Sequence, residues 1–351
     1  MHSPAARTQA TAPRPVEEAA EPLPRGAALD ALVRNADRPL VFRGAGRQLP
    51  LVVAGLESPR AAADYLLGRH SDRPVTVYRA AAETGGRFHY DAALDGFNFT
   101  GTREPLADVL AELVAGPRDD EIVYVGSTDL DIFFPGLRAA NDPGVDGVAG
   151  DADAPVLASL WMGNGTVTAA HYDFSNNAAL CAAGRRRFTL FPPDQIGNLY
   201  PGPLEQTPGG QVVSMVDFAA PDFDRFPRFA EALDNAQVAE LEPGDVIVYP
   251  AMWWHQVEGL ERFNILLNWW WNRVPAFVDS PQVTLMHGLL SLRQRPAAER
   301  AAWRAVFDHY LFADPEQAAG HLPGHAQGPL APIDRPLARR LRAAIMQRLN
   351  R

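Results

Sequence analysis

The chain has 351 residues, of which 47% are hydrophobic and 21% are charged, so its composition is that of a folded globular protein and excludes general disorder. Its 32 basic and 42 acidic residues give a formal net charge of -10, which argues against nucleic acid as a partner. A single cysteine, Cys181, excludes an intrachain disulfide and a cysteine-rich metal cluster.

The apolar segments are short. No run approaches the roughly 18 to 20 residues that a membrane span requires, and the first residues lack the apolar segment of a secretory signal. We therefore expect no membrane association. Because one cysteine suits a reducing compartment, we predict a cytoplasmic location.

The first part of the chain predicts a tail and then an α/β region. Residues 1–27 are rich in Ala, Pro, Arg and Glu without apolar periodicity, and we expect a flexible tail. Residues 28–155 alternate between helical and strand patterns. Ser58 is the predicted N-cap of a helix over 59–69, and a second amphipathic helix is predicted over 105–115. Strands are predicted at 39–44, 75–78, 88–90, 97–99 and 122–125.

The rest of the chain changes pattern twice. Residues 156–274 contain short apolar strands separated by Gly and Pro turns, which is typical of a jelly roll. Within them, the glycine-containing segment 194–239 is predicted to be an insertion that lines the mouth of a site. Residues 275–351 have a helical period, with predicted helices at 283–293, 297–311 and 336–349. The last helix carries an apolar stripe that needs a partner, either the barrel or another subunit.

Two distant motifs indicate a metal site. His171 and Asp173 lie two positions apart in an apolar strand, so their side chains point to the same face. His255 follows two tryptophans and precedes another apolar strand. Two imidazoles and one carboxylate leave coordination positions open on an octahedral ion, which suits non-haem Fe(II). For an isolated His-x-Asp, the alternative is a buried structural histidine and an aspartate that caps a turn.

The sequence around these residues resembles the cupin-like JmjC family of 2-oxoglutarate oxygenases, and within it the asparaginyl hydroxylases that act on hypoxia-inducible factor. The motifs that carry the resemblance lie at residues 161–163, 171–173, 191–195, 243–245 and 253–255. It implies a mainly β fold, the double-stranded β-helix, with the N-terminal α/β region beside the barrel and C-terminal helices that make a homodimer. It also implies Fe(II) at the three ligands, 2-oxoglutarate as cosubstrate, and O2.

The resemblance also implies cosubstrate contacts. Arg186 matches the position of a Lys that holds the distal carboxylate of 2-oxoglutarate, and its planar fork suits the same role. Thr168 and Tyr124 match hydroxyl donors to that carboxylate, and Asn177 and Asn268 match residues near the keto-acid end. Without the resemblance, these are ordinary strand residues, and Arg186 is one of three arginines that follow a turn.

Trp270 and Gln211 are the candidates for substrate contact. Trp270 shares a strand face with Asn268, so it can wall the entrance, with core packing as the alternative. Gln211 lies in the segment where the resembling hydroxylases carry a glutamine that orients the target asparagine. Since the other glutamines of that segment are missing here, the sequence leaves the substrate open between a protein side chain and a small molecule.

Taken together, the residues and the resemblance predict a 2-oxoglutarate-dependent Fe(II) dioxygenase. We expect a hydroxylase that couples oxidation of a substrate C–H bond to decarboxylation of 2-oxoglutarate to succinate and CO2, with demethylation if the carbon is an N-methyl group. Two alternatives stay open. One is a non-catalytic cupin-like metal-binding protein, and the other is a cupin enzyme that uses another metal without 2-oxoglutarate.

Overall fold

The computed structural model describes residues 12–116, 120–149 and 155–350. The chain divides into two compact units, residues 1–273 and 274–351, and each is described by itself. Among the described residues, no helix combines the length and the apolar character that crossing a bilayer demands.

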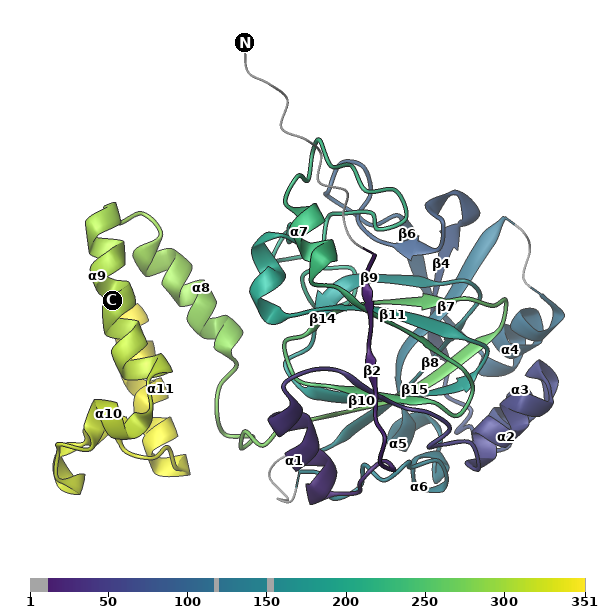
Figure 1. Ribbon diagram of the computed structural model, residues 1–351, viewed down its shortest axis with the longest axis horizontal. Coiled ribbons are helices and arrows are strands. Elements are labelled where there is room, and N and C mark those ends of the chain that lie inside the picture. The colour runs from purple at the N-terminus through teal and green to yellow at the C-terminus, as the bar shows by residue number, and fades with distance from the viewer. Residues whose placement is uncertain (1–11, 117–119, 150–154, 351) are drawn as a thin grey trace, which may run out of the picture. The chain divides into compact units, whose positions relative to one another are not determined.

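The first unit is built on two sheets, which form separate layers of strands in Figure 1. The six-stranded sheet contains, in spatial order, β1 (Arg14–Pro15), β12 (Gln237–Leu241), β11 (Arg186–Phe191), β14 (Trp254–Gly259), β9 (Val167–Tyr172) and β5 (Arg87–Phe88). The nine-stranded sheet contains β2 (Glu17–Glu18), β3 (Leu40–Phe42), β13 (Val246–Tyr249), β10 (Asn176–Ala183), β15 (Asn264–Trp271), β8 (Leu157–Gly163), β7 (Glu121–Asp129), β4 (Val75–Ala81) and β6 (Phe99–Glu104).

The two sheets share an apolar core. Phe188 and Leu190 of β11 pack in one cluster with Ala179 and Cys181 of β10, because alternate residues of each strand face the opposite sheet. Cys181 is a buried free thiol, as its apolar setting predicts. This architecture confirms the predicted mainly β, jelly-roll class.

Most helices of the first unit pack on one face of the nine-stranded sheet, whereas α7 (Phe229–Asp234) packs against β9, β11 and β14 of the six-stranded sheet. The other helices of this unit are α1 (Ala27–Ala36), α2 (Pro50–Glu57), α3 (Pro59–Leu67), α4 (Leu106–Ala115), α5 (Leu130–Phe133) and α6 (Leu137–Ala140). Ser58 caps α3 by accepting a hydrogen bond from the Ala61 N–H, as predicted. Val75 and Val77 of β4 belong to the same buried cluster as residues of α1 to α6, whereas Tyr78 belongs to a cluster on the other face.

The N-terminal α/β region continues the barrel rather than forming a layer of its own. β7 pairs antiparallel with β8, and β4 and β6 extend the same sheet beyond β7. The predicted strands at 75–78 and 122–125 and the helix at 105–115 are confirmed, with longer strands than expected.

The expected flexible tail is wrong for residues 12–27. Residues 14–15 form β1 at the edge of one sheet, and residues 17–18 form β2, which pairs with β3 in the other. Val16 between them is buried in the core shared by the two sheets. Proline prevents a helix in this segment but is tolerated at a sheet edge, where one N–H faces outward. Residues 1–11, the rest of the expected tail, lie outside the described residues.

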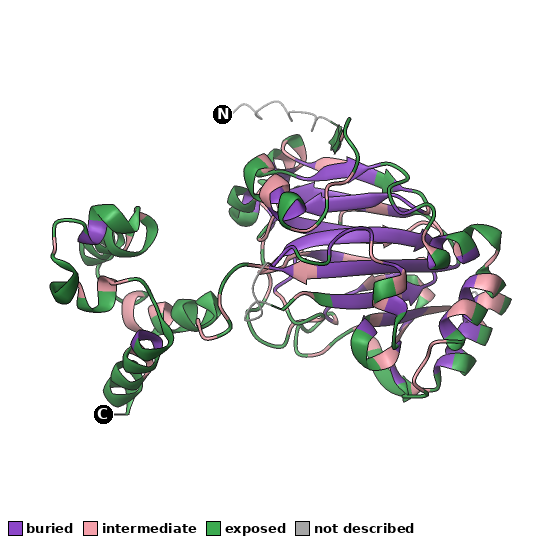
Figure 2. Cartoon of the chain, turned by 90° about the horizontal axis from the view of Figure 1, so that it is seen from below, coloured by how far each residue is buried: buried purple, intermediate pink, exposed green. Residues whose placement is uncertain are grey.

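The second unit is helical. It contains α8 (Pro281–Leu292), α9 (Ala297–Phe307), the π-helix η3 (Asp308–Phe312), α10 (Pro315–Ala319) and α11 (Arg335–Leu349), which confirms the three predicted helices. Figure 2 shows that these helices are mostly exposed, in contrast to the buried strands of the first unit.

Candidate metal centre

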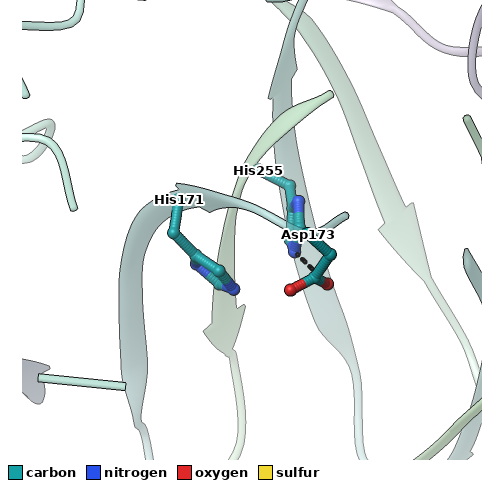
Figure 3. Close-up of side chains that lie close together, drawn as sticks. All are labelled: His171, Asp173 and His255. Atoms are coloured by element: carbon teal, nitrogen blue, oxygen red, sulfur yellow. Dashed lines mark ion pairs between the residues drawn. The ribbon is translucent and has the colours of Figure 1, made fainter. Parts of the chain in front are cut away.

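Two neighbouring strands bring the three predicted ligands together. β14 pairs antiparallel with β9, and His255 lies directly opposite His171 in that ladder. Their ring centroids are 4.3 Å apart. Asp173 follows the end of β9, and one ligand atom from each residue lies within 4.8 Å of the others, as Figure 3 illustrates.

The loop before His255 is fastened to the segment that carries Asp173. The Met252 N–H donates to the Asp173 carbonyl oxygen at 2.8 Å, and the Ala251 N–H donates to Asn176 Oδ1 at 3.0 Å. Met252 has a φ of 68°, a left-handed conformation that costs free energy for a residue with a side chain. These bonds hold two distant parts of the chain in one place.

Both imidazoles present the same nitrogen to the centre. Nδ1 of His171 lies 2.9 Å from the Ala169 carbonyl oxygen, and Nδ1 of His255 lies 3.0 Å from the Trp253 carbonyl oxygen. Because a carbonyl oxygen only accepts, each Nδ1 carries the proton and donates. Each Nε2 therefore keeps a lone pair for a metal ion.

His255 is neutral at pH 7. Burial, with the neighbouring His171, lowers the pKa of His255 to about 4. Its Nε2 lies 3.5 Å from Asp173 Oδ2, the approach marked in Figure 3. Since the ring is uncharged, this contact is not an ion pair. It brings two atoms that can bind a metal ion close together.

The Asp173 carboxylate is oriented by two donors. Trp270 Nε1 donates to Oδ2 at 2.9 Å, and Asn177 Nδ2 donates to the same oxygen at 3.3 Å. Trp270 therefore contacts a predicted metal ligand as well as lining the cavity. The donor set of two neutral imidazole nitrogens and one carboxylate oxygen matches what Fe(II) binds in a facial site.

A hydrogen-bonded series continues from Asn177 into the barrel. Asn268 Nδ2 donates to Asn177 Oδ1 at 3.4 Å, and Trp161 Nε1 donates to Asn268 Oδ1 at 2.6 Å. Both asparagines are buried, so these bonds satisfy amides that would otherwise be costly.

Arg186 is a buried cation without an acidic partner among the described residues. It is 2% exposed, its Nη2 reaches the Trp161 carbonyl oxygen at 3.4 Å, and its Nε has no hydrogen-bond partner there. Burial lowers the pKa of Arg186, but a guanidinium stays charged in proteins. Its neighbours Arg185 and Arg187 are exposed and pair with glutamates, as strand alternation predicts.

Two hydroxyls accompany Arg186 in the same cavity. The Tyr124 hydroxyl and Thr168 Oγ1 are 3.3 Å apart, and either can donate. Burial raises the pKa of Tyr124 to about 12, so it stays protonated and able to donate. A cation and two hydroxyls form a group suited to a carboxylate.

One cavity of about 320 Å³ between the two sheets connects all of these groups. Its lining includes every site residue that the sequence predicted: His171, Asp173, His255, Arg186, Thr168, Tyr124, Asn177, Asn268, Trp270 and Gln211. Gln211 comes from the predicted insertion 194–239, so part of that segment does line the site. The structure thus places these residues together, and their individual roles stay predictions.

Two lining residues were missed as members of the site. Tyr249 lies with its ring 4.9 Å from the His255 ring and is hydrogen-bonded to Asn177, and burial raises its pKa. Its position at the end of β13, just before the loop that leads to His255, was a usable signal. Trp161 belongs to the motif at 161–163 but was not predicted as a site residue, and it donates to Asn268 and offers its carbonyl oxygen to Arg186.

The fold and the centre define a cupin protein. The chain belongs to the family described as the cupin-like domain, which matches residues 27–277. Over 116 residues it is 36% identical to HSPB1-associated protein 1 of Homo sapiens, which is 32% of this chain and 23% of that protein.

Two further relatives are similar over comparable lengths. Lysine-specific demethylase JMJ31 of Arabidopsis thaliana is 29% identical over 136 residues, 36% of this chain and 24% of the relative. The tRNA wybutosine-synthesizing protein 5 of Gallus gallus is 36% identical over 106 residues, 30% of each chain. The matched part spans less than a third of these curated relatives. They are JmjC-type cupin proteins, which confirms the predicted family.

Proposed function

We propose that this protein is a 2-oxoglutarate-dependent Fe(II) oxygenase, and specifically a hydroxylase. The observation that carries the proposal is Arg186, a buried guanidinium that has no acidic partner among the described residues and lines the same cavity as the ligand triad. A buried cation without a counter-charge is costly, so its presence favours an anionic ligand that binds there.

Each group of the cavity has a role in this proposal. His171, Asp173 and His255 would hold Fe(II), which together with 2-oxoglutarate and O2 supplies the oxidising chemistry. Arg186 binds the distal carboxylate of 2-oxoglutarate, and the hydroxyls of Tyr124 and Thr168 donate to it.

The asparagines and Trp270 position the carboxylate ligand. By donating to Oδ2 of Asp173, Trp270 and Asn177 fix the orientation of the carboxylate beside His255. Asn268 holds Asn177 in turn. These bonds preorganise the site before any metal ion binds.

The relatives' names do not supply a common substrate. One name refers to lysine and another to tRNA, and the matched segments are partial. We therefore propose the reaction type alone, oxidation of a C–H bond with conversion of 2-oxoglutarate to succinate and CO2.

The test is 2-oxoglutarate binding by the wild type, Arg186→Met and Arg185→Met, measured by calorimetry with Mn(II) as a redox-inert metal. Arg186→Met should weaken binding about 30-fold or more, because it removes the cationic partner of a buried carboxylate. Arg185→Met, a matched loss of an exposed arginine, should change affinity less than about twofold. Without ligand, Arg186→Met should be as stable as the wild type or more stable, since it removes an unpaired buried charge.

The other outcomes point to the alternatives. If the wild type binds the metal but not 2-oxoglutarate, the protein is a cupin of another kind, either an enzyme with a different metal or a non-catalytic binder. Equal affinity of the wild type and Arg186→Met for 2-oxoglutarate would show that Arg186 does not bind its distal carboxylate. Metal analysis after anaerobic purification identifies the metal that is retained.

A further inference from the structure

A second cavity of about 510 Å³ adjoins the metal centre. His171, Thr168 and Gln211 line both cavities, so the two spaces meet beside a metal ligand. The walls of the second cavity carry six aromatic rings: Tyr78, Phe88, Phe97, Phe99, Tyr124 and Trp161. We call this second cavity the aromatic pocket.

The pairing of the strands explains why the rings gather there. Tyr78 of β4 is the direct cross-strand neighbour of Tyr124 of β7, so both rings face the same side of the nine-stranded sheet. Phe88 comes from the opposite sheet, where β5 pairs with β9 and places Phe88 beside Thr168. Both sheets therefore contribute to the lining of the aromatic pocket.

Flat ring pairs form its walls. Phe97 and Phe99 are stacked with centroids 5.1 Å apart and an interplanar angle of 11°. Tyr124 and Trp161 are stacked at 6.1 Å and 23°. The ring faces that these pairs leave free favour a planar guest, because such a guest can stack on them.

A β-bulge lies where the two cavities meet, because Ser127 lines both of them. The register of β7 against β8 shifts between Val125 and Thr128, and Ser127 has a φ of 42°. A Cβ added at Gly126 would lie 3.2 Å from the Tyr124 ring and 3.4 Å from the Trp161 ring. Bulges often redirect strands beside active sites, and strained residues such as a left-handed serine cluster at functional sites. Both features therefore support a binding site at this position.

The charge of the lining decides which guest fits. No Asp, Glu, Lys or Arg lines the aromatic pocket among the described residues, and its polar side chains are hydroxyls, one imidazole and one amide. Neither an ammonium group nor a carboxylate would find a counter-charge among the lining residues of the pocket, because the charged groups Arg186 and Asp173 line the adjoining cavity instead.

We propose that the prime substrate places an uncharged aromatic group in the aromatic pocket, beside His171. The inference rests on the proposed function, because the pocket can be a substrate site only if the adjoining metal centre catalyses a reaction. It goes further by naming the substrate class: a molecule or segment with a neutral, planar apolar group next to the carbon that is oxidised.

Three probes of different character test this proposal by calorimetry on the full chain, with and without Mn(II) and 2-oxoglutarate. They are naphthalene-2-carboxamide, cyclohexanecarboxamide and choline. We expect the naphthalene probe to bind about two- to tenfold more tightly than the cyclohexane probe, which is the range of aromatic pair contacts, and choline not to bind.

Two variants and a control locate the binding. Phe97→Ala should weaken binding of the naphthalene probe about two- to tenfold, because it removes one flat wall. Gly126→Leu should abolish it by filling the pocket. Phe223→Ala is the matched control, since Phe223 is 41% exposed, Phe97 is 37% exposed, and Phe223 does not line the pocket. If Gly126→Leu fails to fold, Phe97→Ala carries the test.

The outcomes separate this inference from the proposed function. Tighter binding of choline, equal binding of the two carboxamides, or no effect of Phe97→Ala would each overturn the assignment of a neutral aromatic group. If 2-oxoglutarate binds but the naphthalene probe does not, the inference fails and the proposed function stands. If the naphthalene probe binds but 2-oxoglutarate does not, the proposed function fails and the aromatic pocket stands.

Discussion

Asp173 illustrates how single side chains prepare the centre. Its Oδ2 accepts from an indole and an amide, while the described contacts include no hydrogen bond to its Oδ1. A carboxylate that is held through one oxygen presents the other in a defined direction, so less rotational freedom is lost when an ion binds. The indole of Trp270 supplies the shorter of the two bonds.

The Trp270→Phe variant tests this role. Phenylalanine keeps a ring at the position but lacks the N–H donor, so we expect Mn(II) affinity to fall about tenfold, the lower end of the range for partners of metal ligands. Metal titration by calorimetry measures the change. Trp303→Phe, which alters an exposed indole of the second unit, is the control and should leave metal affinity unchanged. Equal affinity in both variants would show that the N–H does not support the carboxylate.

The residues of the centre differ in how well sequence predicts them. His171 and Asp173 follow from strand alternation, which needs only their spacing, and the position of His255 follows from its motif. Arg186 was predicted by resemblance, but its lack of an acidic partner among the described residues depends on how the strands pack. The partners of Trp161 and Trp270 could not be predicted, because an indole N–H reveals its acceptor only when distant strands are placed together.

At the scale of elements, the short segment of β1 and β2 joins the edges of both sheets. β1 pairs with β12 in one sheet, and β2 pairs with β3 in the other. Between them, Val16 is 4% exposed and contributes to the core of the barrel. The segment therefore closes one side of the two-sheet stack.

Replacement of Val16 by alanine measures what this closure contributes. We expect Val16→Ala to lower the free energy of unfolding by about 1–3 kcal/mol, since it removes buried apolar surface and leaves a cavity. Urea unfolding followed by circular dichroism gives the value. Glu17→Ala, at an exposed position paired with Arg38, should cost less than about 1 kcal/mol. If Val16→Ala were as stable as the wild type, the segment would pair with the sheet edges without contributing to the stability of the core.

Elements with local signals were predictable and those without them were not. Helix α3 has a serine cap and a proline in its first turn, so its start is encoded within a few residues. β1 and β2 are two residues each and contain no periodic pattern to detect. They form because the sheet edges beside them have open backbone groups, and only the folded barrel supplies those edges.

At the scale of the molecule, the second unit exposes a large amount of apolar surface. Leu290 and Phe312 are each 77% exposed, and further apolar side chains on α8, α9, η3 and α11 are exposed as well. Patches of this kind mark interfaces. We propose that the partner is a second copy of this chain, as the resemblance implies, because closed symmetric dimers are the commonest way to cover such a surface.

Light scattering after size-exclusion chromatography tests the dimer. The wild type should have twice the mass of one chain. The double variant Leu290→Glu and Phe312→Glu should have the mass of one chain, because two charges would have to be buried at the interface. Val53→Glu, at a half-exposed position of α2 in the first unit, is the control and should stay dimeric. A wild type with the mass of one chain would reject the proposal.

The direct pairing of His171 with His255 has a consequence for how this protein can change. If one residue were deleted from β9 and the strand paired again in a register shifted by one residue, its backbone hydrogen bonds could re-form. The His171 imidazole would then point to the opposite face of the sheet. The register of β9 against β14 thus determines whether the two imidazoles lie on the same face of the sheet. Within these two strands, a shift of one residue would therefore remove the predicted ion site while the backbone pairing of the barrel is kept.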